Sequence, residues 1–355
     1  MEVVVTAVLM FFATALIGGL ALLAQWARKN RAAEITLIVM VLFVSVLVAG
    51  LGALAAVASN GGLLGGETQN RPLIVASTLL IVLAGLAGLA LCVPPLRRVA
   101  SRRGQRSVAD GPGAFETAPQ EDAAVGGRWA DPPVFYGLWL AVTILAYNLV
   151  NLLFLPVLAE SGAFGDAAVT PVLVLISELP FVVVALCGVG FLVRRDFRET
   201  LVRLGYGPVT ARQLALVPPF VAAALAFALA SDWLFVRLQP GLSEQVNEVS
   251  QGLFSTSGMS LFSAVLFGLL IGIGAAAGEE TLFRGAVQPA LGITLTSLLF
   301  ASVHTQYGLS IILVHIFLLS VGLGLLRKYA NTTLAFITHA TYNFTLVLLS
   351  HFFGI

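Results

Sequence analysis

Long apolar runs, separated by short polar stretches, dominate the chain. A helix needs about 20 apolar residues to cross the hydrocarbon core of a bilayer. By that measure the pattern predicts ten membrane-spanning helices, the eighth of them short because it ends just past His304. The fold class expected is an all-α polytopic transmembrane helical bundle. The ten runs lie at 3–27, 35–58, 73–95, 134–158, 170–193, 214–236, 261–287, 293–306, 309–326 and 334–353.

Two stretches between the runs have a character of their own. Residues 97–133 are rich in Gly, Pro, Ala and acidic residues and lack periodicity, which predicts a disordered cytoplasmic linker. This linker would divide three N-terminal membrane helices, in 1–96, from a core domain in 134–355. Residues 195–213 alternate apolar with charged positions, which is typical of a short interfacial helix. Gly205 is expected to end it.

Charge supports a membrane location and predicts an orientation. Charged residues make up 10% of the 355 residues, against about 25% in a soluble domain. With ten spans, the basic clusters after the first, third, fifth and ninth runs all fall on one side, which predicts both termini outside. We expect a multi-pass protein of the bacterial inner membrane, with the lipid bilayer as a partner. The net charge of +1 gives no sign of a nucleic-acid partner, and we expect none.

Polar side chains interrupt three of the C-terminal runs. An ionisable group at membrane depth is costly and is therefore a functional hypothesis. If 261–304 folds as a hairpin that turns near Gly292, Glu279 and His304 reach the same depth, because they lie 13 and 12 residues from that turn. His339 and Asn343 are four apart and share one helix face. These four side chains are predicted to converge.

The predicted cluster has the parts needed for amide hydrolysis. Glu279 and His304 would activate a water molecule, and His339 and Asn343 would donate hydrogen bonds to the oxyanion. Glu280 and Arg284 are four apart and would form a supporting ion pair. Glu279, His304 and His339 are also the residues that would bind zinc if a metal is used. No H-E-x-x-H motif is present, and we favour metal-independent chemistry, with Zn²⁺ left open.

At these positions the chain resembles the CPBP family of intramembrane proteases, also called Abi or CAAX-protease-like. The three family motifs occur in order over 134–355 as Glu279-Glu280-x-x-x-Arg284, Phe300-x-x-x-His304 and His339-x-x-x-Asn343. The resemblance implies an intramembrane endopeptidase that acts on a membrane-associated peptide or a lipidated protein, such as a prenylated CAAX tail. It also implies the same roles for these residues. Members are described both as metalloproteases and as glutamate-dependent enzymes, and both types remain open here.

Two other functions are compatible with the same residues. An ion- or proton-coupled transporter would use the carboxylates and imidazoles as a relay, although no repeated broken-helix pair supports this. A catalytically silent membrane scaffold would not depend on Glu279 at all. A further carboxylate, Glu178, precedes Pro180 in the fifth run. It could line the same cavity or mark a helix kink.

Overall fold

The computed structural model describes residues 2–60, 71–93, 131–160 and 171–353. Most of the predicted linker lies outside these ranges. Its last residues are described, and Pro132 and Pro133 already belong to a helix. The division into an N-terminal unit, a linker and a core therefore stays a prediction.

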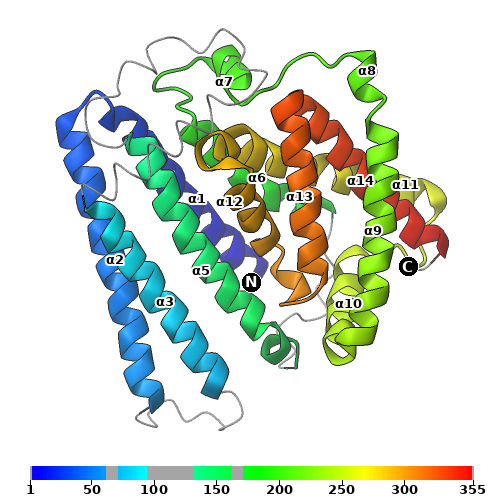
Figure 1. Cartoon of the computed structure of the whole chain (residues 1–355), viewed down its shortest axis with the longest axis horizontal. Coiled ribbons are helices and arrows are strands. Elements are labelled where there is room, and N and C mark those ends of the chain that lie inside the picture. The colour runs from blue at the N-terminus through cyan, green and yellow to red at the C-terminus, as the bar shows by residue number, and fades with distance from the viewer. Residues whose placement is uncertain (1, 61–70, 94–130, 161–170, 354–355) are drawn as a thin grey trace.

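Four long helices form the N-terminal part: α1 (Glu2–Ala27), α2 (Arg31–Asn60), α3 (Arg71–Cys92) and α5 (Pro132–Glu160). The α2 and α3 helices form a pair at one side of the molecule (Figure 1). The indole of Trp139 on α5 donates to Ser45 Oγ on α2 at 3.0 Å. The hydroxyl of Tyr136 donates to the carbonyl of Ile17 on α1 at 2.9 Å. The first helices are thus packed directly onto α5.

The rest of the chain forms a bundle of helices, with three short elements between longer ones. In the described ranges no strand is present beyond an isolated bridge between Phe191 and Arg195, which confirms the all-α fold class. The elements are α6 (Pro171–Gly188), α7 (Phe197–Arg203), α8 (Ala211–Leu214), α9 (Val217–Leu238), α10 (Pro240–Phe254), α11 (Leu261–Glu279), η3 (Glu280–Val287), α12 (Gln288–Ser302), η4 (Thr305–Tyr307), α13 (Ile312–Tyr329) and α14 (Thr332–Phe353).

Eight helical stretches in the described ranges are long and apolar enough to cross a membrane. One of them, Leu261–Ser302, is too long for a single crossing, and its backbone leaves helical geometry at Gly292 (φ 79°, ψ 168°). Dividing it there and adding the shorter apolar helix Ile176–Gly188 accounts for the ten predicted runs. Pro289 does not interrupt the helical path, although it lacks an N–H and lies where η3 runs directly into α12. In the preceding turn, the carbonyl of Arg284 accepts from Nε of Arg327 at 3.1 Å.

One predicted boundary between the fifth and seventh runs was wrong, and one helix there was not predicted. The fifth run ends at Gly188 rather than 193, because the chain turns there. The short helix predicted within 195–213 is confirmed as α7, capped by Asp196; it ends at Arg203, just before Gly205, the residue expected to end it. The α10 helix was not predicted. It is amphipathic, with Val246 and Val249 buried on one face, so it lacks the continuous apolar run that the search for membrane spans required.

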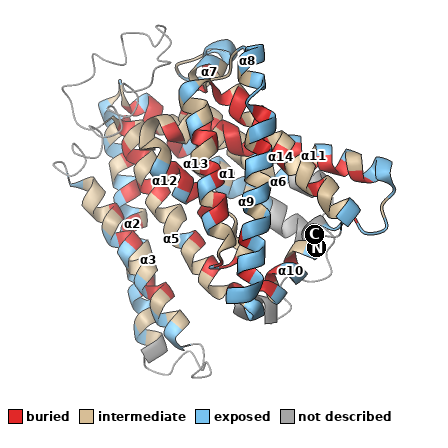
Figure 2. Cartoon of the chain, turned by 45° about the vertical axis from the view of Figure 1, so that its right-hand side comes forward, coloured by how far each residue is buried: buried red, intermediate tan, exposed pale blue. Residues whose placement is uncertain are grey.

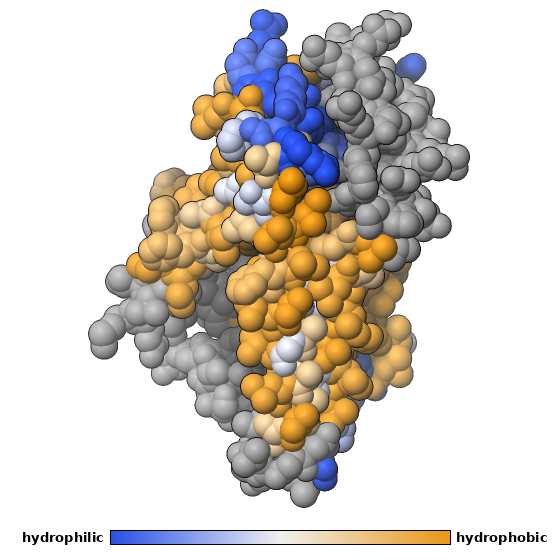
Figure 3. Space-filling view, turned by 90° about the vertical axis from the view of Figure 1, so that its left-hand side faces the viewer, coloured by the Kyte–Doolittle hydropathy of each residue, from blue (hydrophilic) through white to orange (hydrophobic). Residues whose placement is uncertain are grey.

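The surface of the bundle matches a membrane protein. Figure 3 shows an apolar band over one side of the molecule, with hydrophilic residues gathered at one end. Large apolar side chains are exposed on the outer helices, among them Phe43 and Leu54 of α2. Figure 2 shows buried residues concentrated where helices face each other. The chain is therefore an integral multi-pass membrane protein.

Ten spans place the loops alternately at the two ends of the bundle, and two contacts between loops agree with that assignment. At one end, the Arg28 guanidinium pairs with Asp131, so the segment after α1 meets the start of α5. At the other end, the amide nitrogen of Gln239, between α9 and α10, donates to the carbonyl of Leu309 at 3.2 Å. Which end faces the cytoplasm, and where the termini lie, remains a prediction from the basic clusters.

Close packing of α11 against α14 brings together the two helices that carry most of the predicted site. A Cβ on Gly272 would lie only 2.6 Å from the carbonyl oxygen of Ala340. Small residues allow membrane helices to approach this closely. Gly272 therefore allows α11 and α14 to pack closely, and these helices carry Glu279 and His339.

Candidate active site

The two neighbouring glutamates lie at a change of helix type. Glu279 is the last residue of α11, and Glu280 begins the π-helix η3. The apolar pattern predicted a single regular helix through both residues. Segments of π-helix are rare and are frequent at functional sites. Both glutamates are buried, and Glu280 is fully so.

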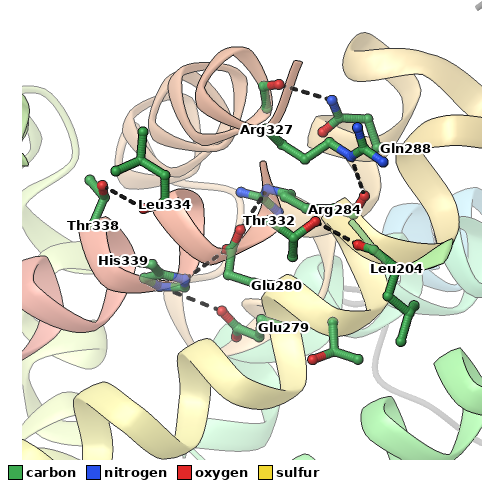
Figure 4. Close-up of polar contacts among 12 residues, drawn as sticks. Leu204, Glu279, Glu280, Arg284, Gln288, Arg327, Thr332, Leu334, Thr338 and His339 are labelled. Carbon is green, nitrogen blue, oxygen red and sulfur yellow. Dashed lines mark hydrogen bonds and ion pairs between the residues drawn. The ribbon is translucent and has the colours of Figure 1, made fainter. Parts of the chain in front are cut away.

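Glu279 lies between two imidazole rings from other segments. Its Oε1 is 3.8 Å from Nε2 of His304, and its Oε2 is 3.6 Å from Nε2 of His339. Figure 4 shows His339 and Glu279 pointing toward each other from facing helices. Both distances exceed a direct hydrogen bond, and a water molecule could bridge such groups.

His304 lies beyond the helix that leads to it. The predicted eighth span reached residue 306, whereas α12 ends at Ser302 and His304 has a non-helical backbone (φ −83°, ψ 54°). Its Nδ1 is 2.8 Å from the carbonyl oxygen of Phe300, which can only accept, so Nδ1 carries a proton. In the neutral ring, Nε2 then has a free lone pair facing Glu279.

A hydrogen bond from α5 fixes the end of α12. The buried amide of Asn148 donates to Ser302 Oγ at 3.1 Å, and that hydroxyl donates to the carbonyl of Leu299 at 2.8 Å. The ring of Phe300 lies 5.0 Å from the ring of His304. These contacts set where the chain leaves α12, and therefore where His304 lies.

Glu280 makes two contacts, of which one was predicted. Its Oε2 is 3.1 Å from Nε of Arg284, and both side chains are fully buried. Its Oε1 is 2.9 Å from Nδ1 of His339, a contact that the sequence did not indicate. The carboxylate accepts from the ring N–H, so Glu280 orients His339 as well as neutralising Arg284. The Arg284 guanidinium lies over the Phe300 ring at 4.5 Å.

Asn343 lies one turn after His339 on α14, as predicted. Its amide nitrogen is 3.2 Å from Nε2 of His339. The four residues predicted to converge are thus neighbours in the structure. Access to them is uneven: the side chains of His304, Glu279 and His339 are 19%, 10% and 4% exposed. A reactant would therefore meet His304 first.

Two further ionisable residues lie in the apolar helices, Glu178 and His315. Glu178 on α6 is half-buried and packs against Gly278, the residue before Glu279. It therefore lies behind α11, next to the site. His315 on α13 instead forms a buried hydrogen bond with the hydroxyl of Tyr342, at 2.9 Å from Nε2. That contact links α13 to α14 and needs no catalytic role.

The zinc alternative was tested against these positions. Zinc in a catalytic site takes three protein ligands at about 2.0–2.2 Å, arranged around one point. In the described part of the chain, no group of three or more His, Cys, Asp or Glu side chains could hold a metal ion. Glu279, His304 and His339 as they stand do not form such a set. We therefore derive no step through a metal.

A small apolar cavity is separate from the polar site. It has a volume of about 230 Å³ and lies on the seam between α11 and α14. None of the four predicted catalytic residues lines it. The lining residues are Leu269, Ile273, Phe336, Ile337, Ala340, Thr341 and Phe344.

Comparison with known proteins identifies the part of the chain that carries the site. Residues 260–345 match a family model described as type II CAAX prenyl endopeptidase Rce1-like. The predicted resemblance is confirmed. The match begins next to α11 and contains all three motifs, including Glu279, His304 and Asn343. No curated protein and no solved structure matches the chain.

Proposed function

We propose that the protein is an intramembrane endopeptidase that hydrolyses a peptide bond with a water molecule activated by Glu279 and His304. The observation that carries the proposal is the position of the Glu279 carboxylate between two imidazoles. The match of residues 260–345 to an endopeptidase family supports a hydrolase over a transporter or a silent scaffold.

Activation of water follows from the protonation of His304. Its Nδ1–H is used by the Phe300 carbonyl, so its Nε2 and the Glu279 carboxylate both accept hydrogen bonds. A water molecule between them donates both of its protons to acceptors, and its oxygen gains nucleophilic character. The oxygen attacks the peptide carbonyl, while one proton passes to Glu279 or His304.

The second pair of residues stabilises the tetrahedral intermediate. Asn343 has two amide N–H groups, of which one faces His339, and the other is available for the oxyanion. When the His339 ring is doubly protonated, its Nε2 donates instead of accepting, and the Asn343 amide then turns its N–H groups away from it. The carboxylates of Glu279 and Glu280 flank this ring and stabilise its positive charge. When the C–N bond breaks, the proton taken from water passes to the leaving amine.

The substrate class follows from the location of the site and from the family. A site within a membrane bundle acts on a membrane-associated peptide or a lipidated protein. The name of the matched family makes a prenylated peptide the first substrate to test. An unmodified peptide of the same sequence is the matched alternative.

The test is cleavage by the purified full-length protein in detergent or vesicles, read by mass spectrometry. Quenched fluorescent peptides would be offered with and without a prenyl group. We expect cleavage by the wild type and a loss of about 10²–10⁴-fold in Glu279→Gln and in His304→Ala. Leu325→Ala, at an exposed position on α13, controls for the effects of mutagenesis and purification on the cleavage rate. Cleavage by both site variants at the wild-type rate would exclude the proposal.

A further inference from the structure

A short segment crosses one end of the bundle and contacts both helices of the site. It comprises residues 204–208, between α7 and α8, and is called the strap below. Its first residue, Leu204, is fully buried and packs with Leu282 and Ala286 of η3. The strap is thus anchored in the interior at Leu204, is partly buried over 205–207 and reaches the surface at Pro208.

Hydrogen bonds tie the strap to the start of α14, the helix that carries His339 and Asn343. Gly205 has a positive φ of 80°, which turns its carbonyl toward Thr332. Asn331 also holds the first turn of α14, by accepting from the N–H of Leu334 at 2.9 Å. The bonds are Thr332 N to Gly205 O (2.9 Å), Thr332 Oγ1 to Leu204 O (2.6 Å), Gly207 N to Thr333 Oγ1 (3.0 Å) and Asn331 Nδ2 to Pro208 O (2.8 Å).

A separate bond ties the strap to the helix of the two glutamates. The hydroxyl of Tyr206 is 2.6 Å from Thr281 Oγ1, in the residue next to Glu280. The Thr281 hydroxyl itself donates to the carbonyl of Ala277 at 2.5 Å, so Tyr206 is the donor to Thr281. Burial raises the pKa of Tyr206 above its ordinary value, so the phenol stays protonated and able to donate at neutral pH.

We propose that the strap is a positioning element of the site and that Tyr206 is a positioning residue for Glu279 and Glu280. This inference rests on the proposed function. The strap joins η3 to α14, and so holds the glutamates at a fixed distance from His339. A π-helical turn is less regular than an α-helical one and needs support from outside. Misplacement of reacting groups by about 1 Å can cost about 10²-fold in rate.

The first test is Tyr206→Phe, which removes only the hydroxyl. We expect kcat for the cleaved peptide to fall roughly three- to tenfold, the range for one lost hydrogen bond, with KM unchanged and only a small fall in melting temperature. Backbone amides of η3 should exchange hydrogen faster. Tyr329→Phe is the matched control, because Tyr329 is 63% exposed on α13 and should behave as wild type.

A second set of variants separates positioning from simple loss of structure. Thr281→Val should also lower kcat, and the double variant should be no slower than Thr281→Val alone, because that substitution already removes the bond to Tyr206. Thr332→Val should also lower kcat, and Thr332→Ser, which keeps the hydroxyl, should restore it.

The outcomes distinguish the two proposals. If Glu279→Gln abolishes cleavage while Tyr206→Phe has wild-type kcat and unchanged exchange in η3, the inference alone is overturned. A fall in kcat that only follows a lower melting temperature, without rescue by Thr332→Ser, also overturns it. If Glu279→Gln cleaves like the wild type, the proposed function fails, and the inference falls with it.

Discussion

Nδ1 of His339 lies 2.9 Å from the Glu280 carboxylate, whose other oxygen is paired with Arg284. A residue expected only to neutralise an arginine therefore also orients a ring of the site. Stability and geometry are therefore linked, because the same carboxylate neutralises the buried Arg284 and orients the His339 ring. This double role can be tested by removing the charge of Glu280 alone and together with that of Arg284.

Glu280→Gln should destabilise the protein by about 3–5 kcal/mol, since it leaves the buried Arg284 unpaired. Thermal unfolding in detergent would measure this loss. The double variant Glu280→Gln/Arg284→Met should recover most of the stability, because no unpaired charge remains. Its cleavage should stay low, because His339 has lost its carboxylate. Full activity in the double variant would show that His339 needs no negative charge at position 280, because a glutamine oxygen can still accept from its Nδ1–H.

Glu178 packs against Gly278. A methyl group added at Gly278 should therefore clash with Glu178, and shortening Glu178 should relieve the clash. A Cβ added at Gly278 would lie 2.2 Å from Glu178 Oε2 and 2.9 Å from its Cβ. Gly278→Ala should therefore destabilise by about 1–3 kcal/mol, and adding Glu178→Ala should restore part of this. Gly137→Ala is the control, because nothing lies within 4 Å of a Cβ there. Equal melting temperatures for Gly278→Ala and Gly137→Ala would show that Glu178 lies elsewhere.

The bond between α5 and α12 should support activity from a distance. Ser302→Ala leaves the buried amide of Asn148 without its acceptor, at a cost of about 1–3 kcal/mol. Because His304 follows two residues later, kcat should fall as well. Asn151→Ala should change neither quantity, since its amide donates to the carbonyl of Tyr147 in its own helix and its side chain forms no hydrogen bond with α12 in the described part of the chain. Measurement of kcat and melting temperature in parallel tests both expectations, and an unaffected kcat in Ser302→Ala would refute the second.

Metal-independent hydrolysis predicts that chelators leave cleavage unchanged. Purified protein would be dialysed against 1,10-phenanthroline and EDTA, its metal content measured, and its cleavage rate compared with untreated protein. Loss of activity that zinc restores would instead assign Glu279, His304 and His339 as ligands. The variant Glu279→Gln, assayed with and without added zinc, provides the control.

Much of the fold was predictable because the bilayer imposes a simple rule. Spans must be long and apolar, so runs such as 35–58 and 73–95 correspond to α2 and α3 with ends shifted by a few residues. The amphipathic α10 was missed for the same reason, because it buries one face against neighbours and contains no such run. The turn at Gly292 was predictable, because glycine readily adopts positive φ.

The candidate site was predictable as a set of residues but not as a network. Polar groups in apolar runs are conspicuous, which singled out Glu279, His304, His339 and Asn343. Nothing local indicates that Glu280 would reach His339, since the two lie 59 positions apart. The contact of Tyr206 with Thr281 spans 75 positions and likewise has no signal in the pattern.

By itself, the amino-acid sequence determined that this is a helical membrane protein with an acidic and imidazole-bearing cluster in its C-terminal helices. That much follows from transfer free energies, which depend on each residue separately. Only the tertiary structure decided the change to π-helix at Glu280, the place of His304 beyond the end of α12, and the tie between the strap and both site helices. These features depend on which side chains meet across helices, and that is set by packing of the whole bundle.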